Sequence, residues 1–225
     1  DTAEGWDQTA IEAALRGAAS FHSVWYGREQ ELREQEWLGP VLDLDAMVEM
    51  GPLWEALAVH ASEEFPEWVS RDDLALHRRL VGSLNAWWAN KESMPHTLIH
   101  NDFNPRNICL RPTDDGPVLC AYDWELATLG LPQHDLAELL IFTLPNDVDE
   151  ATVDHYIEFH RVALEQAVGA PIDPKAWQAG FTAALFDLGI NRLALYIMAH
   201  TFRHYSFMER VVGTWRRICR LKTGF

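Results

Sequence analysis

Apolar residues recur at helical spacing through the first and last parts of the chain, which predicts a largely helical protein. Ile11, Leu15 and Ala18 follow this spacing within a stretch, residues 1 to about 40, that we expect to be helical. The spacing returns at residues 71–91, where it predicts one helix. Four more helices are expected after the middle of the chain, at residues 132–142, 149–168, 173–199 and about 206–221.

A short segment between these helical parts has the pattern of β-strands. Residues 97–99, 108–110 and 118–122 are apolar, β-prone runs, and a turn sequence at residues 114–117 separates the last two. The last two runs therefore predict a hairpin. Such a hairpin brings Asn107, just before its first strand, to the same end as Asp123, just after its second.

The loops of this segment carry the main candidate chemistry. His100, Asp102 and Asn107 follow the spacing H-x-D-x-x-x-x-N, and Asp123 follows the second predicted strand. In kinases with this spacing the Asp accepts the proton of the substrate hydroxyl, the Asn binds magnesium, and a downstream Asp binds metal against the nucleotide phosphates. The pattern predicts phosphoryl transfer, with Asp102 as the base. Asn107 and Asp123 offer the hard oxygen ligands that Mg²⁺ prefers.

Three blocks of sequence resemble the catalytic core of the aminoglycoside and choline kinase-like phosphotransferases, which share the protein-kinase fold. They are residues 100–107, the triplet Asp123-Trp124-Glu125, and residues 130–137 with the sequence GLPQHDLA. The resemblance implies an α+β, mostly helical fold: the C-terminal lobe of a kinase-like protein, in which a small β-hairpin carries the catalytic loop and the metal site. It implies Mg²⁺ and ATP or GTP as cofactors.

The resemblance also implies roles for residues around the three central ones. His100 would be a structural member of the loop, and Asp135 would brace the loop from the start of a helix. Asn104 stands where many bacterial relatives have His, as Asn101 stands where they have Gly. Arg106 either contacts a phosphate or is a solvated surface residue.

Glu125 lies two positions after Asp123. In an extended segment the two side chains would face the same way and share a metal or phosphate environment. A structural role in the loop is the alternative.

The last helices are where relatives bind the acceptor substrate. Their aromatic residues either form a wall for the acceptor or belong to the core, and we favour the core for most of them: Trp177, Phe181, Phe186, Tyr196, Phe202, Tyr205 and Trp215. Asp187 and Glu209 are possible substrate contacts, but a salt bridge or an exposed position is the simpler interpretation of each.

The Gly-rich hairpin and strand Lys with which kinases cover the nucleotide do not precede the motif in this sequence. The sequence begins with Asp1, and the resemblance places residues 11–25 just beyond the hinge between the lobes. We therefore expect a single C-terminal lobe over residues 1–225, made of a helical entry (1–95), a catalytic core (96–131) and a helical substrate-side subdomain (132–225). The nucleotide-binding lobe would lie upstream or on another chain, so the fragment alone should be a poor catalyst.

Composition narrows the class of partner. The net charge of −16 argues against nucleic acid as a partner and either serves solubility or favours a cationic substrate. No targeting signal or membrane span is predicted, because the longest apolar run, residues 181–200, contains Asp187, Asn191 and Arg192. The three cysteines are odd in number and not spaced for zinc, which favours reduced thiols and a cytoplasmic protein.

The sequence thus predicts an enzyme that transfers the γ-phosphate of ATP to a hydroxyl of a small molecule, such as an antibiotic, an amino alcohol or a sugar-like compound. A pseudokinase or binding module with the same fold is one alternative. A metal-dependent hydrolase is the other, with His100, Asp102, Asp123 and His134 around two metal ions.

Overall fold

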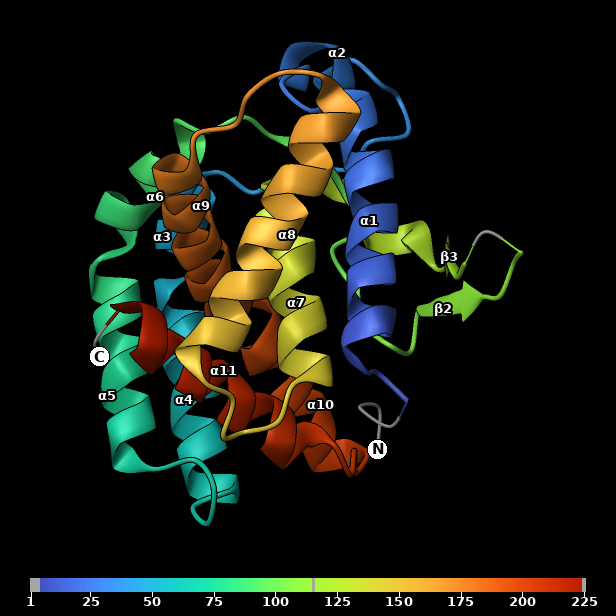
Figure 1. The fold of residues 1–225 in the computed structure, drawn as a ribbon. Helices are drawn as coiled ribbons and strands as arrows, with labels where there is room; N and C mark the ends of the chain where they lie inside the picture. Colours follow the sequence, from blue (N-terminus) through green and yellow to red (C-terminus); the bar gives the residue numbers. More distant parts are fainter. Residues whose placement is uncertain (1–4, 115, 224–225) are drawn as a thin grey trace.

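A computed structural model describes residues 5–114 and 116–223, so Asp1 and the Asp115 of the predicted turn lie outside the described residues. The described part is mostly helical and holds two small antiparallel sheets (Figure 1). One sheet pairs β1 (Thr97–Ile99) with β4 (Thr128–Gly130), and the other pairs β2 (Ile108–Arg111) with β3 (Val118–Ala121). The mostly helical α+β composition agrees with the prediction and is compatible with a kinase-like fold.

The first helices are shorter than the pattern predicted. Helix α1 (Gln8–Trp25) begins at Asp7, whose carboxylate accepts a 2.9 Å hydrogen bond from the Ala10 amide, and α2 (Glu29–Arg33) is one short turn. The expectation of helix to about residue 40 is wrong in two places: Gly27, with a left-handed backbone (φ 71°), separates α1 from α2, and residues 34–43 lie outside helices. Two helices follow this irregular stretch, α3 (Leu44–Glu49) and α4 (Gly51–Glu64).

The single helix predicted at residues 71–91 is two helices in the structure. Helix α5 (Arg71–Gly82) ends at Ser83, and α6 (Leu84–Glu92) starts directly after it. The Ser83 hydroxyl donates to the carbonyls of Arg79 and Leu80 at 2.9 and 3.2 Å. A serine that bonds the preceding turn competes with the helical pattern, and here it follows a glycine, so the helix is interrupted at this position.

The helices after the core confirm the prediction closely. They are α7 (Gln133–Thr143), α8 (Glu150–Val168), α9 (Pro174–Asp187), the π-helical turn η2 (Leu188–Leu193), α10 (Ala194–Phe202) and α11 (Met208–Thr223). Every residue of α7 is buried, and Figure 1 shows this helix surrounded by α1, α8 and α9. The carboxylates on α7 therefore stand at the centre of the fold.

The apolar run in the second half of the chain belongs to this core. The segment Pro174–Phe202 is long and apolar enough to cross a membrane, but 67% of its apolar window is buried inside the protein. Trp177, Phe181, Phe186 and Trp215 are buried, as expected for core residues. Phe202 is an exception, because 84% of it is exposed.

The predicted hairpin is present as β2 and β3, and it projects from the helical body beside α1 (Figure 1). Its register pairs Ile108 with Ala121, so Asn107 and Asp123 lie at the same end, as predicted. The Tyr122 amide donates to the Asn107 carbonyl at 3.0 Å and fixes this end of the hairpin. Gly17 of α1 packs directly on Leu119 of β3, where a Cβ atom would overlap the leucine side chain.

Replacing Gly17 with Ala is expected to lower the free energy of unfolding, because the added methyl group forces the hairpin away from α1. Overpacking of this kind costs about 1–3 kcal/mol. Urea unfolding followed by circular dichroism would measure it. Gly82→Ala is the control: a Cβ atom there meets nothing within 4 Å, and Ala favours helix, so a loss of stability in Gly82→Ala equal to that in Gly17→Ala would contradict this account.

Candidate active site

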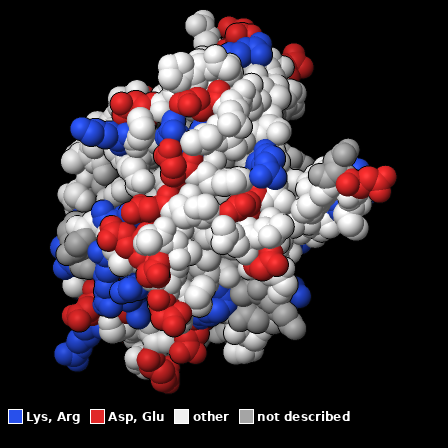
Figure 2. Space-filling model, in the orientation of Figure 1, with Lys and Arg blue, Asp and Glu red and all other residues white. Residues whose placement is uncertain are grey.

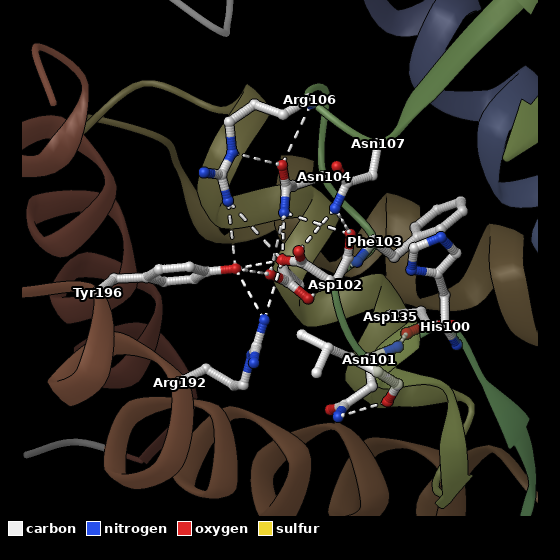
Figure 3. Close-up of polar contacts among 12 residues, drawn as sticks. His100, Asn101, Asp102, Phe103, Asn104, Arg106, Asn107, Asp135, Arg192 and Tyr196 are labelled. Carbon is white, nitrogen blue, oxygen red and sulfur yellow. Dashed lines mark hydrogen bonds and ion pairs between the residues drawn. The ribbon is translucent and has the colours of Figure 1, made fainter. Parts of the chain in front are cut away.

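The loop at residues 100–107 connects β1 to β2 and is held from below by α7 (Figure 3). Asp135, in the first turn of α7, is fully buried. Its Oδ2 accepts from the His100 amide at 2.8 Å and its Oδ1 from the Asn101 amide at 2.9 Å. His22 of α1 completes the contact, with Nε2 3.0 Å from Oδ2. Asp135 thus ties α1 and α7 to the start of the loop.

The charge of Asp135 is stabilised by these contacts. Burial raises the pKa of the Asp135 carboxyl, but the hydrogen bond and charge of His22 and the His100 amide outweigh burial and hold that pKa below its ordinary value. The carboxylate therefore remains ionised in the core.

Glu138, one turn further along α7, is a second buried carboxyl group beneath the loop that the sequence analysis did not single out. Its Oε2 accepts from the Phe103 amide at 3.0 Å, and its Oε1 accepts from Asn104 Nδ2 at 3.2 Å. Burial raises the pKa of Glu138 to about 7. The spacing of Asp135 and Glu138, three residues apart on a predicted helix, was a signal that both face the loop.

Asp102 lies at the centre of a polar cluster, with 16% of its side chain exposed (Figure 3). The side-chain amide of Asn107 donates to its Oδ2 at 2.7 Å, and that of Asn104 donates to its Oδ1 at 2.8 Å. Two residues of the predicted motif therefore orient the carboxylate directly. His100 lies to one side: its Nε2 is 2.8 Å from the Tyr122 carbonyl, which makes it a link between the loop and the hairpin.

Three side chains contact Asp102 from the side of the last helices and from the loop (Figure 3). Tyr196 of α10 donates its hydroxyl to Asp102 Oδ1, and Arg192 Nη2 of η2 lies 3.0 Å from the same oxygen. Arg106 donates to Asn104 Oδ1 at 3.0 Å and to the Tyr196 hydroxyl at 3.2 Å, and its Nη2 is 3.7 Å from Asp102 Oδ1. Arg106 is therefore a part-buried member of the cluster rather than a solvated surface residue.

Neither Arg192 nor Tyr196 was predicted at this site. Arg192 was noted only as a charge that disfavours a membrane span, and Tyr196 as one of several aromatic residues. The π-helical turn, which no sequence pattern marked, places Arg192 one turn before Tyr196 on the same face, and Arg192 Nη2 donates to the Tyr196 hydroxyl at 2.9 Å.

The cluster keeps Asp102 ionised. Burial raises the pKa of the Asp102 carboxyl, but the hydrogen bond from Tyr196 and the charges of Arg192 and Arg106 outweigh burial, so that pKa lies below its ordinary value. An ionised, part-buried carboxylate is able to accept a proton from a bound hydroxyl group.

The predicted metal ligands lie at the open end of the hairpin. Asn107 uses its side-chain NH₂ group on Asp102, which leaves its Oδ1 without a hydrogen-bond partner among the described residues. Asp123 is exposed and follows Tyr122, whose amide is bonded to Asn107. One amide oxygen and one carboxylate, with water and phosphate oxygens, fit the way Mg²⁺ is held in phosphoryl-transfer sites.

The geometry corrects the interpretation of Glu125. Asp123 has a left-handed backbone (φ 62°), and Trp124–Leu126 forms the short 3₁₀ turn η1, so the segment is not extended. The expectation that Asp123 and Glu125 face the same way through strand alternation is therefore wrong. Asp123 and Asn101 are the residues other than glycine with positive φ in the described part of the chain. Strained backbone of this kind concentrates at functional sites, and here it flanks both loops.

Other candidates have structural explanations. Asp187 is buried and paired with Lys91 at 2.7 Å, which confirms the salt-bridge interpretation. His134 faces Asp187 at 4.0 Å rather than the catalytic loop. With His100 bound to a backbone carbonyl, the four residues imagined for a two-metal hydrolase are not gathered, and the described residues contain no group of three or more His, Cys, Asp or Glu that could hold a metal.

The surface charge is dispersed on the face seen in Figure 2. Acidic side chains are spread over this face, with Lys and Arg side chains among them. The visible acidic residues thus do not gather into one patch.

The chain is similar to a known family and to a known protein. The model of the phosphotransferase enzyme family matches residues 7–168, which include the loop, the hairpin and α7 but not Arg192 or Tyr196. Acyl-CoA dehydrogenase family member 11 from Gallus gallus is 39% identical over 75 residues, or 31% of this chain. The match spans 10% of that protein's length.

Proposed function

We propose that this chain, which belongs to the phosphotransferase enzyme family, is the catalytic lobe of a kinase that transfers the γ-phosphate of ATP to a hydroxyl group of a small molecule. Membership of the family supports a kinase-type phosphotransferase. The observation that carries the finer proposal is the position of Asp102: an ionised carboxylate 2.7 Å from Asn107 Nδ2, at the end of a hairpin that also presents Asp123.

In the proposed reaction, Asp102 accepts the proton of the acceptor hydroxyl while the hydroxyl oxygen bonds to the γ-phosphorus. The bond between that phosphorus and the β–γ bridging oxygen breaks, and ADP leaves with the bond electrons. The hydrogen bond from the Tyr196 hydroxyl to Asp102 Oδ1 supports this role, because it shows the carboxylate accepting from a hydroxyl group. Asn104 and Asn107 hold the carboxylate in place.

Asn107 Oδ1 and the Asp123 carboxylate are the proposed ligands of Mg²⁺. The ion would supply positive charge to the phosphate oxygens during transfer. Arg106 and Arg192 lie within 4 Å of Asp102 and are placed to add to that charge.

We further propose that a nucleotide-binding lobe, on the same polypeptide or another, covers the phosphates. The strands of the described residues contain no Lys, whereas a kinase pairs the phosphates with a strand Lys. A cytoplasmic location is proposed from the three free cysteines, Cys109, Cys120 and Cys219.

The proposal is tested with the full natural protein, γ-labelled ATP, Mg²⁺ and a panel of hydroxylated small molecules. Labelled phosphate should appear on at least one acceptor, and chelation of Mg²⁺ by EDTA should abolish transfer. Transfer that persists in EDTA would contradict the magnesium assignment. ATP bound without transfer to any alcohol would favour the binding-module alternative.

Replacing Tyr196 with Phe should shift the pH dependence of transfer. The Tyr196 hydroxyl lowers the pKa of Asp102, so its removal raises that pKa and moves the acidic limb of the kcat/KM profile to higher pH. Steady-state rates between pH 4 and 9 would measure the shift. Tyr205→Phe is the control because its ring lies near His200 rather than Asp102, and an equal shift in that variant would contradict the assignment.

A further inference from the structure

A cavity of about 620 Å³ opens beside the catalytic loop. Asn101, which directly precedes Asp102, and Arg192, which is 3.0 Å from Asp102 Oδ1, both line it, and Figure 3 shows them on the same side of Asp102. Asp102 is not itself a lining residue, so the cavity adjoins the proposed base through these two neighbours. Cavities of this volume are of the size that holds drug-sized ligands, and one of choline size would leave most of it empty.

The walls of the cavity are apolar and in part exposed. Trp37, Leu42, Trp124, Leu126 and Leu195 line it, and each is an exposed large hydrophobic residue. Leaving such side chains in water is unfavourable, and a group of them around one cavity marks a binding site. The walls thus favour a ligand with a large apolar body.

One polar group of the lining lacks a partner among the described residues. His134 lines the cavity and is 4% exposed, and no side chain or backbone group in the described part of the chain forms a hydrogen bond with its buried Nε2. Its Nδ1 faces the Asp187 carboxylate at 4.0 Å, which favours a proton on Nδ1 and leaves Nε2 as an acceptor. A buried acceptor without a partner is costly, so a ligand that brings a hydroxyl or N–H group to Nε2 gains binding energy there.

Positively charged side chains in the lining disfavour a positively charged ligand. Lys91 lines the cavity with Nζ 3.8 Å from the centre of the Trp88 ring and 2.7 Å from Asp187, so it already occupies the aromatic face and the buried carboxylate that would attract an ammonium group. Arg192 is a second cation in the lining. Among the described residues of the lining, Glu125 is the one carboxylate outside these pairs, and it is exposed to water.

We propose that this cavity is the acceptor site and that its acceptor is an uncharged alcohol with a large apolar body, carrying a second hydrogen-bond donor that binds His134 Nε2. That the bound alcohol is phosphorylated rests on the proposed function, but the predicted binding does not require ATP. It selects against polycations such as aminoglycosides and against small amino alcohols.

The test measures binding to the full natural protein by titration calorimetry, without nucleotide. The probes are 1,10-decanediol, 1-decanol, the cation 10-amino-1-decanol, and kanamycin. Decanediol should bind about tenfold or more tighter than aminodecanol and kanamycin. His134→Leu should weaken the binding of decanediol by about three- to tenfold and leave the binding of 1-decanol unchanged, because only the diol has a second hydroxyl for Nε2.

A second pair of variants removes the risk that a core change alters folding. Trp37 is 58% exposed, so Trp37→Ala should fold normally and weaken the binding of both neutral alcohols. Phe202 is more exposed and lies outside the cavity, so Phe202→Ala should leave their binding unchanged.

Tighter binding of aminodecanol or kanamycin than of decanediol would overturn the inference, as would equal effects of the two alanine variants or no measurable binding of decanediol. Phosphate transfer to a cationic alcohol would leave the proposed function standing and overturn the inference alone. Binding of decanediol with no transfer to any alcohol in the panel would overturn the function and not the cavity's selectivity.

Discussion

Replacing Asp102 with Asn is expected to lower kcat for phosphate transfer by about a thousandfold, the scale of a lost general base. Asn keeps the size of the side chain but accepts no proton. With its oxygen in the Oδ1 position, the new side chain still accepts from Tyr196 and Asn104, while Asn107 Nδ2 faces another NH₂ group. The local cluster is therefore strained, but α7 still supports the loop. Transfer of label from ATP to an acceptor found with the panel of alcohols measures the change.

Asp147→Asn is the matched control, because Asp147 is exposed in the turn between α7 and α8, beyond the end of α7 opposite to Asp135. It makes the same chemical change without touching the cluster, so its kcat should equal that of the natural protein. An Asp102→Asn variant that retains more than about a tenth of the activity would show that Asp102 is not the base. Nucleotide binding should survive the substitution, which separates loss of chemistry from loss of the site.

The part of this site that follows the chain order was predictable from sequence. The apolar runs near Asp102, Asn107 and Asp123 predict a hairpin. The register of that hairpin brings Asn107 and Asp123 to one end. Asp135 begins a helix with a continuous apolar face, so its position at the start of α7 also follows from local pattern. Local periodicity determines each of these elements.

The rest depended on contacts between distant segments. Tyr196 meets Asp102 across 94 positions of sequence, and no local pattern distinguishes it from the other aromatic residues of the last helices. Strand β4 has three residues, which is too short a run to carry a periodic signal, and it forms because it pairs with β1. The break at Ser83 is a competition between side-chain and helical hydrogen bonds, which spacing of apolar residues does not register.

The way α7 supports the loop leads to the largest expected effect on stability. Asp135→Asn should lower the free energy of unfolding by about 3 kcal/mol or more, because the carboxylate accepts from two loop amides and from His22 in a fully buried position. The neutral amide supplies one acceptor oxygen in place of two and sets an NH₂ group against one of the donors. Urea unfolding at pH 7 measures the difference, and kcat should fall with it because the loop loses its anchor.

The pH dependence of that difference identifies its cause. The pKa of Asp135 is depressed in the folded protein, so its stabilisation is complete above the unfolded-state pKa and is lost as the pH falls through the folded-state pKa. The gap in unfolding free energy between the natural protein and Asp135→Asn should therefore be largest at neutral pH and narrow below about pH 4. Glu55→Gln is the control, since it breaks an exposed ion pair with Arg78 and should change stability little at any pH. A gap that stays constant down to pH 3 would mean that packing, and not the buried charge, is what Asp135 contributes to the loop.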